Sequence, residues 1–204
     1  MRIIAGKHRG RAIRVPKAEA LRPSSDRLRQ AVFNILDHCN SAVPYAGRPV
    51  VDLFAGTGAY GLEALSRGAA FAAFIDLDGA ALLGIRRNAA AMGEAANIAV
   101  LRLDAARLVS PSRAIPEPVA VGFLDPPYLS GLAVPALQGL HAHGWLRPDG
   151  VAVVEVAATE PLPAPTAYTV LDERTYGAGR VVFLRPSAGA APGTLTSRER
   201  AGRS

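Results

Sequence analysis

The chain has 204 residues, half of them hydrophobic, and a formal net charge of +6, which together favour one α/β domain with a sizeable core. Its one cysteine, Cys39, excludes an internal disulfide framework and a zinc site built from clustered cysteines. No apolar run approaches the ~18 residues of a membrane span and no secretory signal opens the chain, so we expect a cytoplasmic protein.

The basic charge is concentrated at the N-terminus. Residues 1–29 hold nine Lys and Arg against two acidic residues, so they carry +7 while the remainder carries −1. A concentrated basic segment indicates a polyanionic partner, and we favour nucleic acid over a merely solvated terminus. The residues expected to contact phosphates are Lys7, Arg9, Arg11, Arg22, Arg27 and Arg29.

The N-terminal arm, residues 1–23, is expected to begin with a small β-hairpin and to continue as an extended linker. Residues 2–5 and 11–15 look like two short strands, because Gly6 and Gly10 bound a turn between them that exposes Lys7 and Arg9. We expect a chain without residues 1–15 to fold, because the alternating strands and helices start near residue 49.

An amphipathic segment follows the arm. Residues 26–37 repeat apolar side chains at helical spacing, which predicts a helix with one face against the core. Arg27 and Arg29 lie off the apolar stripe, so we expect both to be free for a partner.

Strands and helices then alternate, which predicts a parallel sheet covered by helices. The predicted strands are 50–53, 71–75, 99–103, 119–124 and 151–156, and the predicted helices are 59–66, 79–92 and 132–143. Two last strands, 168–172 and 181–184, are expected to form an antiparallel hairpin at the sheet edge. We therefore expect an α/β domain over residues 24–186, followed by a disordered tail over residues 187–204.

Glycines follow the first predicted strand in the spacing G-x-G-x-x-G, at Gly56, Gly58 and Gly61. This spacing is typical of dinucleotide-binding loops, so a nicotinamide-dependent oxidoreductase is one possible function. Asp52, at the tip of that strand, disfavours it because a carboxylate would face a pyrophosphate of the same sign. An acid there suits a ligand with a cationic amine and no phosphate, and S-adenosylmethionine is such a ligand.

Aspartates lie at or just past the ends of four predicted strands, namely Asp52, Asp76, Asp104 and Asp125. Ligands of open α/β sheets bind beyond the carboxyl ends of the strands, so we expect these acids on one rim. Asp76 can accept hydrogen bonds from both ribose hydroxyls, or it can cap the next helix. Asp104 can accept from the adenine amine, or it can be an ordinary helix cap.

The predicted cofactor site draws on this whole rim. Its residues are Asp52, Phe54, Gly56, Gly58, Asp76, Leu77, Asp104 and Ala105, together with Ser25 where the arm joins the domain. Arg22 is a further candidate beside Ser25 for the methionine end of the cofactor, in addition to its predicted role in RNA binding.

The tetrapeptide Asp125-Pro126-Pro127-Tyr128 follows the predicted strand 119–124 and forms the predicted catalytic site. Neither proline has an N–H to donate, so the pair ends the strand and stiffens the turn. The acid and a main-chain carbonyl can accept hydrogen bonds from the exocyclic amine of a base, and the ring can stack on that base. Taken alone, the tetrapeptide is also compatible with a plain Pro-Pro turn capped by Asp.

These motifs resemble those of the RsmD family of small-subunit ribosomal RNA guanine-N2 methyltransferases, within the class I S-adenosylmethionine-dependent enzymes. The resemblance covers residues 2 to about 185, and it includes the segments 2–7, 9–11, 21–27, 33–36, 52–58, 61–69 and 125–128. The N-terminal segments are the most specific, because generic methyltransferases share the glycine loop but not these. The sequence departs from the family at Gln30, where an acid is usual, and at Tyr60, where a smaller or aliphatic residue is usual.

The resemblance implies a Rossmann-like seven-stranded, mostly parallel sheet whose last strand is antiparallel, with a small N-terminal β-hairpin extension. It implies methylation of the exocyclic N2 of one guanine in 16S ribosomal RNA, in the small subunit or an assembly intermediate, with S-adenosylmethionine as cofactor. We expect a monomer that needs no metal and no membrane.

Two other functions stay open. A DNA amino-methyltransferase acting on adenine or cytosine would share the Asp-Pro-Pro-Tyr chemistry, but such enzymes commonly carry a target-recognition domain for which this chain has no room. A non-catalytic RNA-binding assembly factor is the other, and the intact set of acids and glycines speaks against it.

Overall fold

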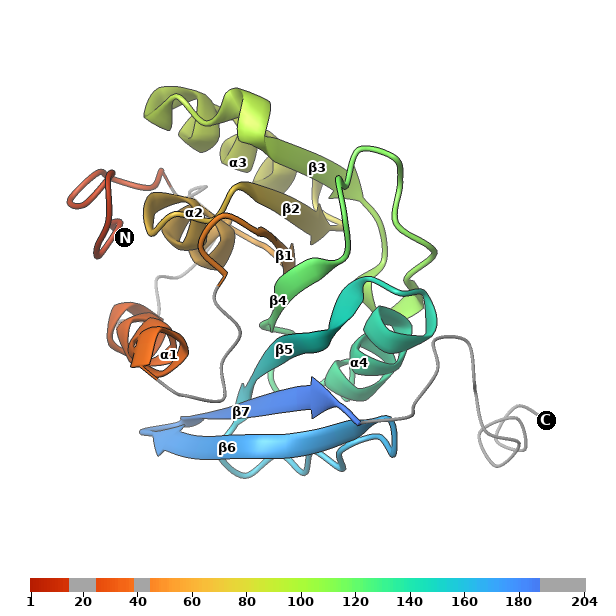
Figure 1. Cartoon of the computed structure of the whole chain (residues 1–204). Helices are drawn as coiled ribbons and strands as arrows, with labels where there is room; N and C mark the ends of the chain where they lie inside the picture. The colour runs from red at the N-terminus through yellow and green to blue at the C-terminus, as the bar shows by residue number, and fades with distance from the viewer. Residues whose placement is uncertain (15–24, 39–44, 188–204) are drawn as a thin grey trace.

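One seven-stranded sheet forms the centre of the computed structural model of this chain, which describes residues 1–14, 25–38 and 45–187 (Figure 1). The strands are β1 (Pro49–Leu53), β2 (Phe71–Asp76), β3 (Ile98–Arg102), β4 (Val119–Leu124), β5 (Leu146–Ala157), β6 (Tyr168–Tyr176) and β7 (Gly179–Pro186). Their order across the sheet is β3-β2-β1-β4-β5-β7-β6. Strands β1 to β5 are parallel, and β7 lies antiparallel between β5 and β6. The predicted Rossmann-like sheet with an antiparallel last strand is confirmed.

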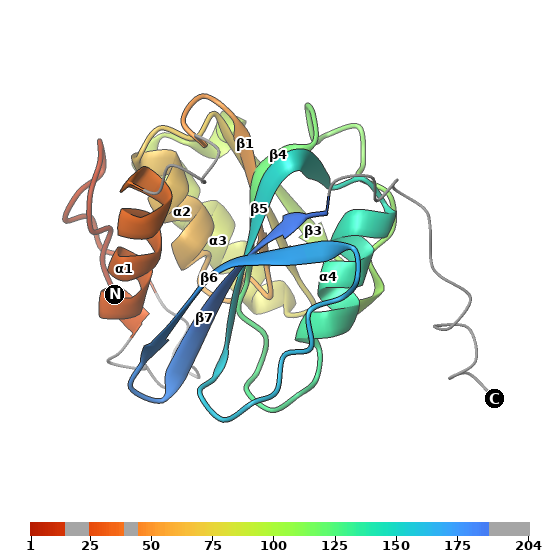
Figure 2. The same ribbon diagram turned by 60° about the horizontal axis from the view of Figure 1, so that its bottom comes forward.

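Helices cover both faces of this sheet (Figure 2). Figure 2 shows α1 (Ser25–His38), α2 (Ala59–Ser66) and α3 (Gly79–Met92) on one side, and α4 (Ala133–Ala142) on the other. Short 3-10 turns precede and follow β3, namely η1 (Ala95–Asn97) and η2 (Ala105–Arg107). Within the described residues, no helix combines the length and the apolar character needed to cross a membrane.

Side chains along the central strands alternate between two hydrophobic clusters, as the pleat of a strand requires. In β4, Phe123 belongs to the cluster with α1 and α2, whereas Leu124 belongs to the cluster with α4. In β5, Val153 and Val154 divide in the same way. The sheet therefore has a hydrophobic core on each face. Residues two positions apart in a strand face the same core, so the face of a residue at a strand end follows from the residue two positions before it.

The strand order reverses at β1, whose neighbours are β2 on one side and β4 on the other. The chain runs outward from β1 to β3 and then crosses back to β4. Open α/β sheets bind their ligands at such a switch point, beyond the carboxyl ends of the strands.

The N-terminal arm packs against α2 as a loop with one β-bridge, between Arg2 and Ala12 (Figure 1). The predicted hairpin is thus present, but its pairing is short. Ile3 and Ile13 are buried in the same cluster as the core of the domain. The expectation that a chain without residues 1–15 folds conflicts with this burial, because their loss would open the core.

Candidate active site

A cavity of about 540 Å³ lies at the carboxyl ends of β1 to β5, a size typical of small-molecule sites. Its walls include most of the predicted site residues, namely Asp52, Phe54, Gly56, Asp76, Leu77, Asp104, Ala105, Asp125, Pro126 and Pro127. Gly58 and Tyr128 are not among the lining residues. Arg22 and the side chain of Ser25 lie outside the described part of the chain.

The glycine loop brings α2 close against β2. Gly58 has a φ of 75° and precedes the first residue of α2, and a Cβ there would lie 2.9 Å from Ile85 Cγ1. A Cβ at Gly61 would lie 2.4 Å from the ring of Phe74. Both positions therefore need glycine, at Gly58 for the left-handed backbone and at Gly61 for the close approach.

Asp52 is 2% exposed, and its carboxylate accepts a hydrogen bond from the N–H of Gly61 at 2.9 Å. Asp52, at the end of β1, therefore supplies an acceptor for a backbone N–H in the first turn of α2, which has no partner within the helix. Burial raises the pKa of Asp52 to about 8. The hydrogen bond from Gly61 lowers this pKa, and the nearby charge of Asp76 raises it. A cationic group in the cavity would favour the ionised carboxylate.

Asp76 fastens the glycine loop to β2. Its carboxylate accepts from the N–H of Gly56 at 2.7 Å and from the N–H of Asp78 at 2.9 Å. The cap of α3 is Asp78, whose side chain accepts from Ala80 at 2.8 Å, so the capping alternative for Asp76 is wrong. Two of about four acceptor positions on Asp76 are used in this way.

Asp104 caps the 3-10 turn η2 by accepting from the N–H of Ala106 at 2.9 Å. The ordinary capping role is therefore confirmed. Asp104 also lines the cavity, and its contact with an adenine amine stays a prediction.

The Asp-Pro-Pro-Tyr segment leaves β4 with Asp125, Pro127 and the buried Pro126 all on the cavity wall. The Tyr128 hydroxyl donates to Glu155 Oε1 at 2.8 Å. A Cβ at Gly179 would lie 2.8 Å from the same hydroxyl, so a larger residue there would have to displace it. Stacking of Tyr128 on a base stays a prediction, since the ring is not on the cavity wall.

Glu155 and Tyr60 line the cavity although the predicted site contains neither. The Tyr60 hydroxyl donates to Glu155 Oε2 at 3.0 Å, and its ring stacks on Phe123 with centroids 5.1 Å apart. The one signal for Glu155 in the sequence is that it is a single acid inside the apolar run 151–156. The strand pattern alone assigns no chemistry to that position.

The basic residues of the arm and α1 differ in exposure, and Arg29 contradicts its prediction. Its side chain is 1% exposed, and Nη2 donates to the carbonyl of Arg2 at 2.7 Å and to Asp26 at 3.0 Å. Its Nε lies 3.9 Å from the buried carboxylate of Glu63. The expectation that Arg29 is free for a partner is therefore wrong, because the arm and α2 supply buried acceptors for it.

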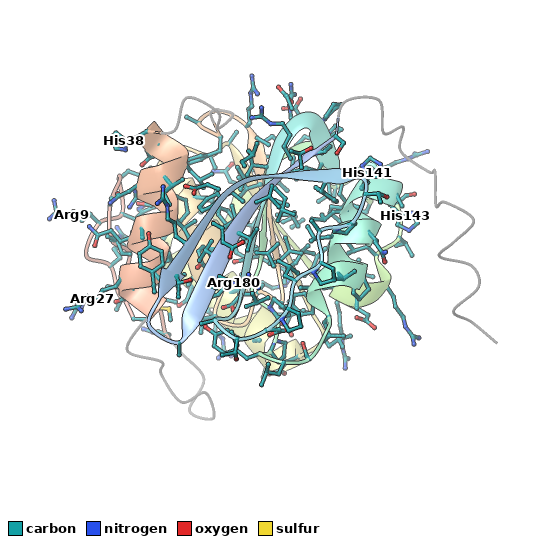
Figure 3. The ribbon with its side chains drawn as sticks, turned by 90° about the horizontal axis from the view of Figure 1, so that it is seen from below. Arg9, Arg27, His38, His141, His143 and Arg180 are labelled. Carbon is teal, nitrogen blue, oxygen red and sulfur yellow. The ribbon has the colours of Figure 1, made fainter. Side chains whose placement is uncertain are left out.

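Arg9 and Arg27 point outward from the body of the protein, as predicted for residues that meet a partner (Figure 3). Lys7 is half exposed but forms an ion pair with Glu94 at 2.6 Å, and Arg11 donates to the carbonyl of Ala91. Contact of these four side chains with RNA stays a prediction.

Named methyltransferases are similar to this chain over most of its length. Ribosomal RNA small subunit methyltransferase D of Haemophilus influenzae is 35% identical over 179 residues, which cover 87% of this chain and 89% of that protein. The protein of the same name from Escherichia coli strain K12 is 36% identical over 183 residues, which cover 90% and 87%. The solved structure of putative methyltransferase yhhF from Escherichia coli gives a TM-score of 0.77 at 32% identity, covering 92% of this chain and 98% of that one.

A family model described as Conserved hypothetical protein 95 matches residues 1–185. The match takes in the arm, the glycine loop and the Asp-Pro-Pro-Tyr segment, so it covers both the most specific motifs and the whole cavity. The resemblance stated from the sequence is therefore confirmed. This chain belongs to the RsmD family of methyltransferases.

Proposed function

We propose that this protein transfers a methyl group from S-adenosylmethionine to the exocyclic N2 of a guanine in small-subunit ribosomal RNA, at position 966 of 16S RNA. One observation carries the proposal: Asp125 and Pro126 share a single cavity with Asp52, Asp76 and Asp104. Acceptors for the exocyclic amine of a base thus lie in the same cavity as three acids that could bind the amine, the ribose and the adenine of the cofactor. The names of the relatives support small-subunit ribosomal RNA as the substrate.

The residues of the cavity fit S-adenosylmethionine by their chemistry. Asp52 would hold the cationic amine, because a buried carboxylate with a raised pKa gains most from a positive partner. Asp76, which has acceptor capacity beyond its two backbone bonds, would take the ribose hydroxyls. Asp104 would accept from the adenine amine at the far end.

The cofactor supplies a methyl group on a cationic sulfur, which keeps the electron pair of the broken S–C bond. The guanine amine is a poor nucleophile, because its lone pair is delocalised into the ring. Asp125 and the carbonyl of Pro126 would accept its two N–H bonds and bring the lone pair out of conjugation. That lone pair forms the new N–C bond, and the proton that N2 must then lose passes to Asp125 or to water.

This chemistry depends on positioning and electrostatics. The two prolines hold Asp125 on a rigid turn, so no reorganisation is needed when the amine arrives. The target base must leave its stack to enter the cavity, and the basic arm would hold the surrounding phosphates. A monomer in the cytoplasm stays our expectation for the protein's state and place.

Methyl transfer to small-subunit particles that lack the modification tests the proposal. With labelled S-adenosylmethionine, we expect the wild type to label the RNA and Asp125→Ala to lose at least ~10²-fold in rate while keeping cofactor affinity, by analogy with a lost oriented hydrogen-bond partner. The matched control is Asp149→Ala, an exposed acid away from the cavity, which should label normally. Normal turnover by Asp125→Ala, or no labelling by the wild type, would overturn the proposal.

A further inference from the structure

We propose that Glu155 selects guanine over adenine and cytosine by accepting a hydrogen bond from the ring N1–H of the target base. The inference rests on the proposed function, because it assigns a partner to the amine-binding site of Asp125. It concerns a residue on the cavity wall for which that function alone supplies no role.

The sheet brings Glu155 beside Asp125. Strands β4 and β5 are parallel neighbours, and their last paired residues are Leu124 and Val154, each of which directly precedes one of the two acids. Neighbouring strands lie about 4.8 Å apart. Asp125 lies two residues after Phe123, and Glu155 lies two residues after Val153. Phe123 and Val153 pack under α1 and α2, and side chains two residues apart share a face, so both acids are directed to that face.

Tyr60 shows that the two carboxylates share one environment. Burial raises the pKa of the Tyr60 hydroxyl well above its usual value, and the charges of Glu155 and Asp125 raise it further. The hydroxyl therefore stays protonated and donates a hydrogen bond to Glu155. Both acids thus lie within electrostatic reach of one buried oxygen.

Two tyrosines hold the Glu155 carboxylate in a fixed orientation. Tyr60 donates to Oε2 at 3.0 Å and Tyr128 donates to Oε1 at 2.8 Å. The Tyr60 ring is stacked on Phe123, and a Cβ at Gly179 would lie 2.8 Å from the Tyr128 hydroxyl, so the glycine leaves room for it. A carboxylate has about four acceptor positions, so these two bonds leave capacity for another donor, and Glu155 lines the cavity.

Guanine is the base whose hydrogen-bonding edge fits two adjacent carboxylates. It presents the N2 amine and the N1–H side by side, both as donors. Adenine presents an acceptor, N1, beside its amine, and cytosine presents N3, so either would set a lone pair against Glu155. A site built to accept a hydrogen bond rejects a ligand that lacks the donor, because the buried acceptor is then left unpaired.

A base analogue separates recognition of N1–H from the chemistry at the amine. 2-Aminopurine keeps the exocyclic amine at position 2, but its N1 is an acceptor. It is placed, by ligation of 16S RNA, at the nucleotide that the wild type methylates. We expect the wild type to prefer guanine by ~10²-fold or more in kcat/KM, a loss typical of an unpaired buried group.

The variant Glu155→Gln tests the residue itself. Its amide can donate to N1 of 2-aminopurine, so the preference for guanine should fall by ~10-fold or more. Glu173→Gln is the matched control, because it makes the same change at an exposed acid of β6 that does not line the cavity. That control should keep the preference for guanine, and a merely structural role of Glu155 would lower activity on both bases alike without changing the ratio.

The outcomes separate the inference from the function on which it rests. Failure of the wild type to methylate guanine would contradict the proposed function. If the wild type methylates guanine and 2-aminopurine equally well, or if folded Glu155→Gln keeps the wild-type ratio, the inference is overturned. The wild-type ratio decides the matter even if Glu155→Gln does not fold.

Discussion

The carboxylate of Glu63 accepts a hydrogen bond from the backbone N–H of Ile4 at 2.7 Å, inside the contact between α2 and the arm. It also accepts from Ala5 at 3.0 Å and from Nε of Arg67 at 2.8 Å. The helix that follows the glycine loop therefore also holds the arm. Because Met1 also lies on the cavity wall, the basic arm reaches from α2 to the cavity beside the glycine loop.

The substitution Glu63→Leu should lower the free energy of unfolding by about 3 kcal/mol. It leaves the two arm N–H groups without an acceptor and removes one of the two carboxylates beside each of Arg29 and Arg67, which keep only Asp26 and Asp37. Urea unfolding measures the loss. Glu117→Leu, at an exposed loop position, is the control and should change stability little. A loss below ~1 kcal/mol for Glu63→Leu would contradict the role of Glu63 as the anchor of the arm.

The substitution Asp76→Ala should weaken S-adenosylmethionine binding by about 1–3 kcal/mol, the range for losing hydrogen bonds to a charged group. Calorimetry checks the affinity. The control is Asp78→Ala, two residues away, which loses the cap of α3 but does not line the cavity. That control should lower stability by about 1 kcal/mol and leave the affinity unchanged. Equal affinities for wild type and Asp76→Ala would remove Asp76 from the cofactor site.

The predictions from sequence succeeded where local signals were strong. The bounds of α2, α3 and β4 agree with the expected ranges 59–66, 79–92 and 119–124. Each is an apolar-rich segment bounded by glycine, aspartate or proline. β5 begins at Leu146, earlier than predicted, because the segment Pro148-Asp149-Gly150 indicates a turn although pairing starts before it.

Long-range partners account for the failures. The helical pattern shows that Arg29 lies off the apolar stripe, but it cannot show that Glu63 and the arm surround that position. Glu155 is missed for the same reason, since its partners Tyr60 and Tyr128 are brought together only by the sheet. These partners of Arg29 and Glu155 lie far away in the chain, whereas periodicity reports only on neighbours.

Cofactor binding should strengthen as the pH rises from 6 towards 8. The pKa of Asp52 is about 8 because of burial, so the carboxyl is mostly protonated at neutral pH and must lose its proton to face a cationic amine. Calorimetry in buffers of different ionisation enthalpy should detect proton release on binding. Asp52→Asn should bind more weakly and without this pH dependence.

The same shift affects stability with a definite sign. The folded state holds the Asp52 proton more tightly than the unfolded state, so the contribution of Asp52 to stability is lost as the pH rises from about 4 to about 8. Asp52→Asn lacks this titration, so its stability should fall less over that range. An identical pH profile for the two proteins would contradict the raised pKa.

RNA binding should depend on Arg9 and Arg27, the outward-pointing arginines of the arm and α1 (Figure 3). The double change to alanine should reduce the slope of log affinity against log salt by about 1.5, since each phosphate contact contributes roughly 0.7–0.9. Filter binding to small-subunit RNA over a range of salt measures it. The matched control changes Arg113 and Arg174, two exposed arginines outside the arm. If both pairs have the same effect, the arm does not bind the RNA specifically.

Nucleoside analysis of the product tests the central claim most directly. Unmodified small-subunit particles are incubated with this protein and S-adenosylmethionine, and the 16S RNA is digested and separated by mass spectrometry. We predict N2-methylguanosine, formed at one nucleotide and absent when Asp125 is replaced. Methylation of adenosine or cytidine, methylation on another atom of guanosine, or no methylation at all would contradict the account.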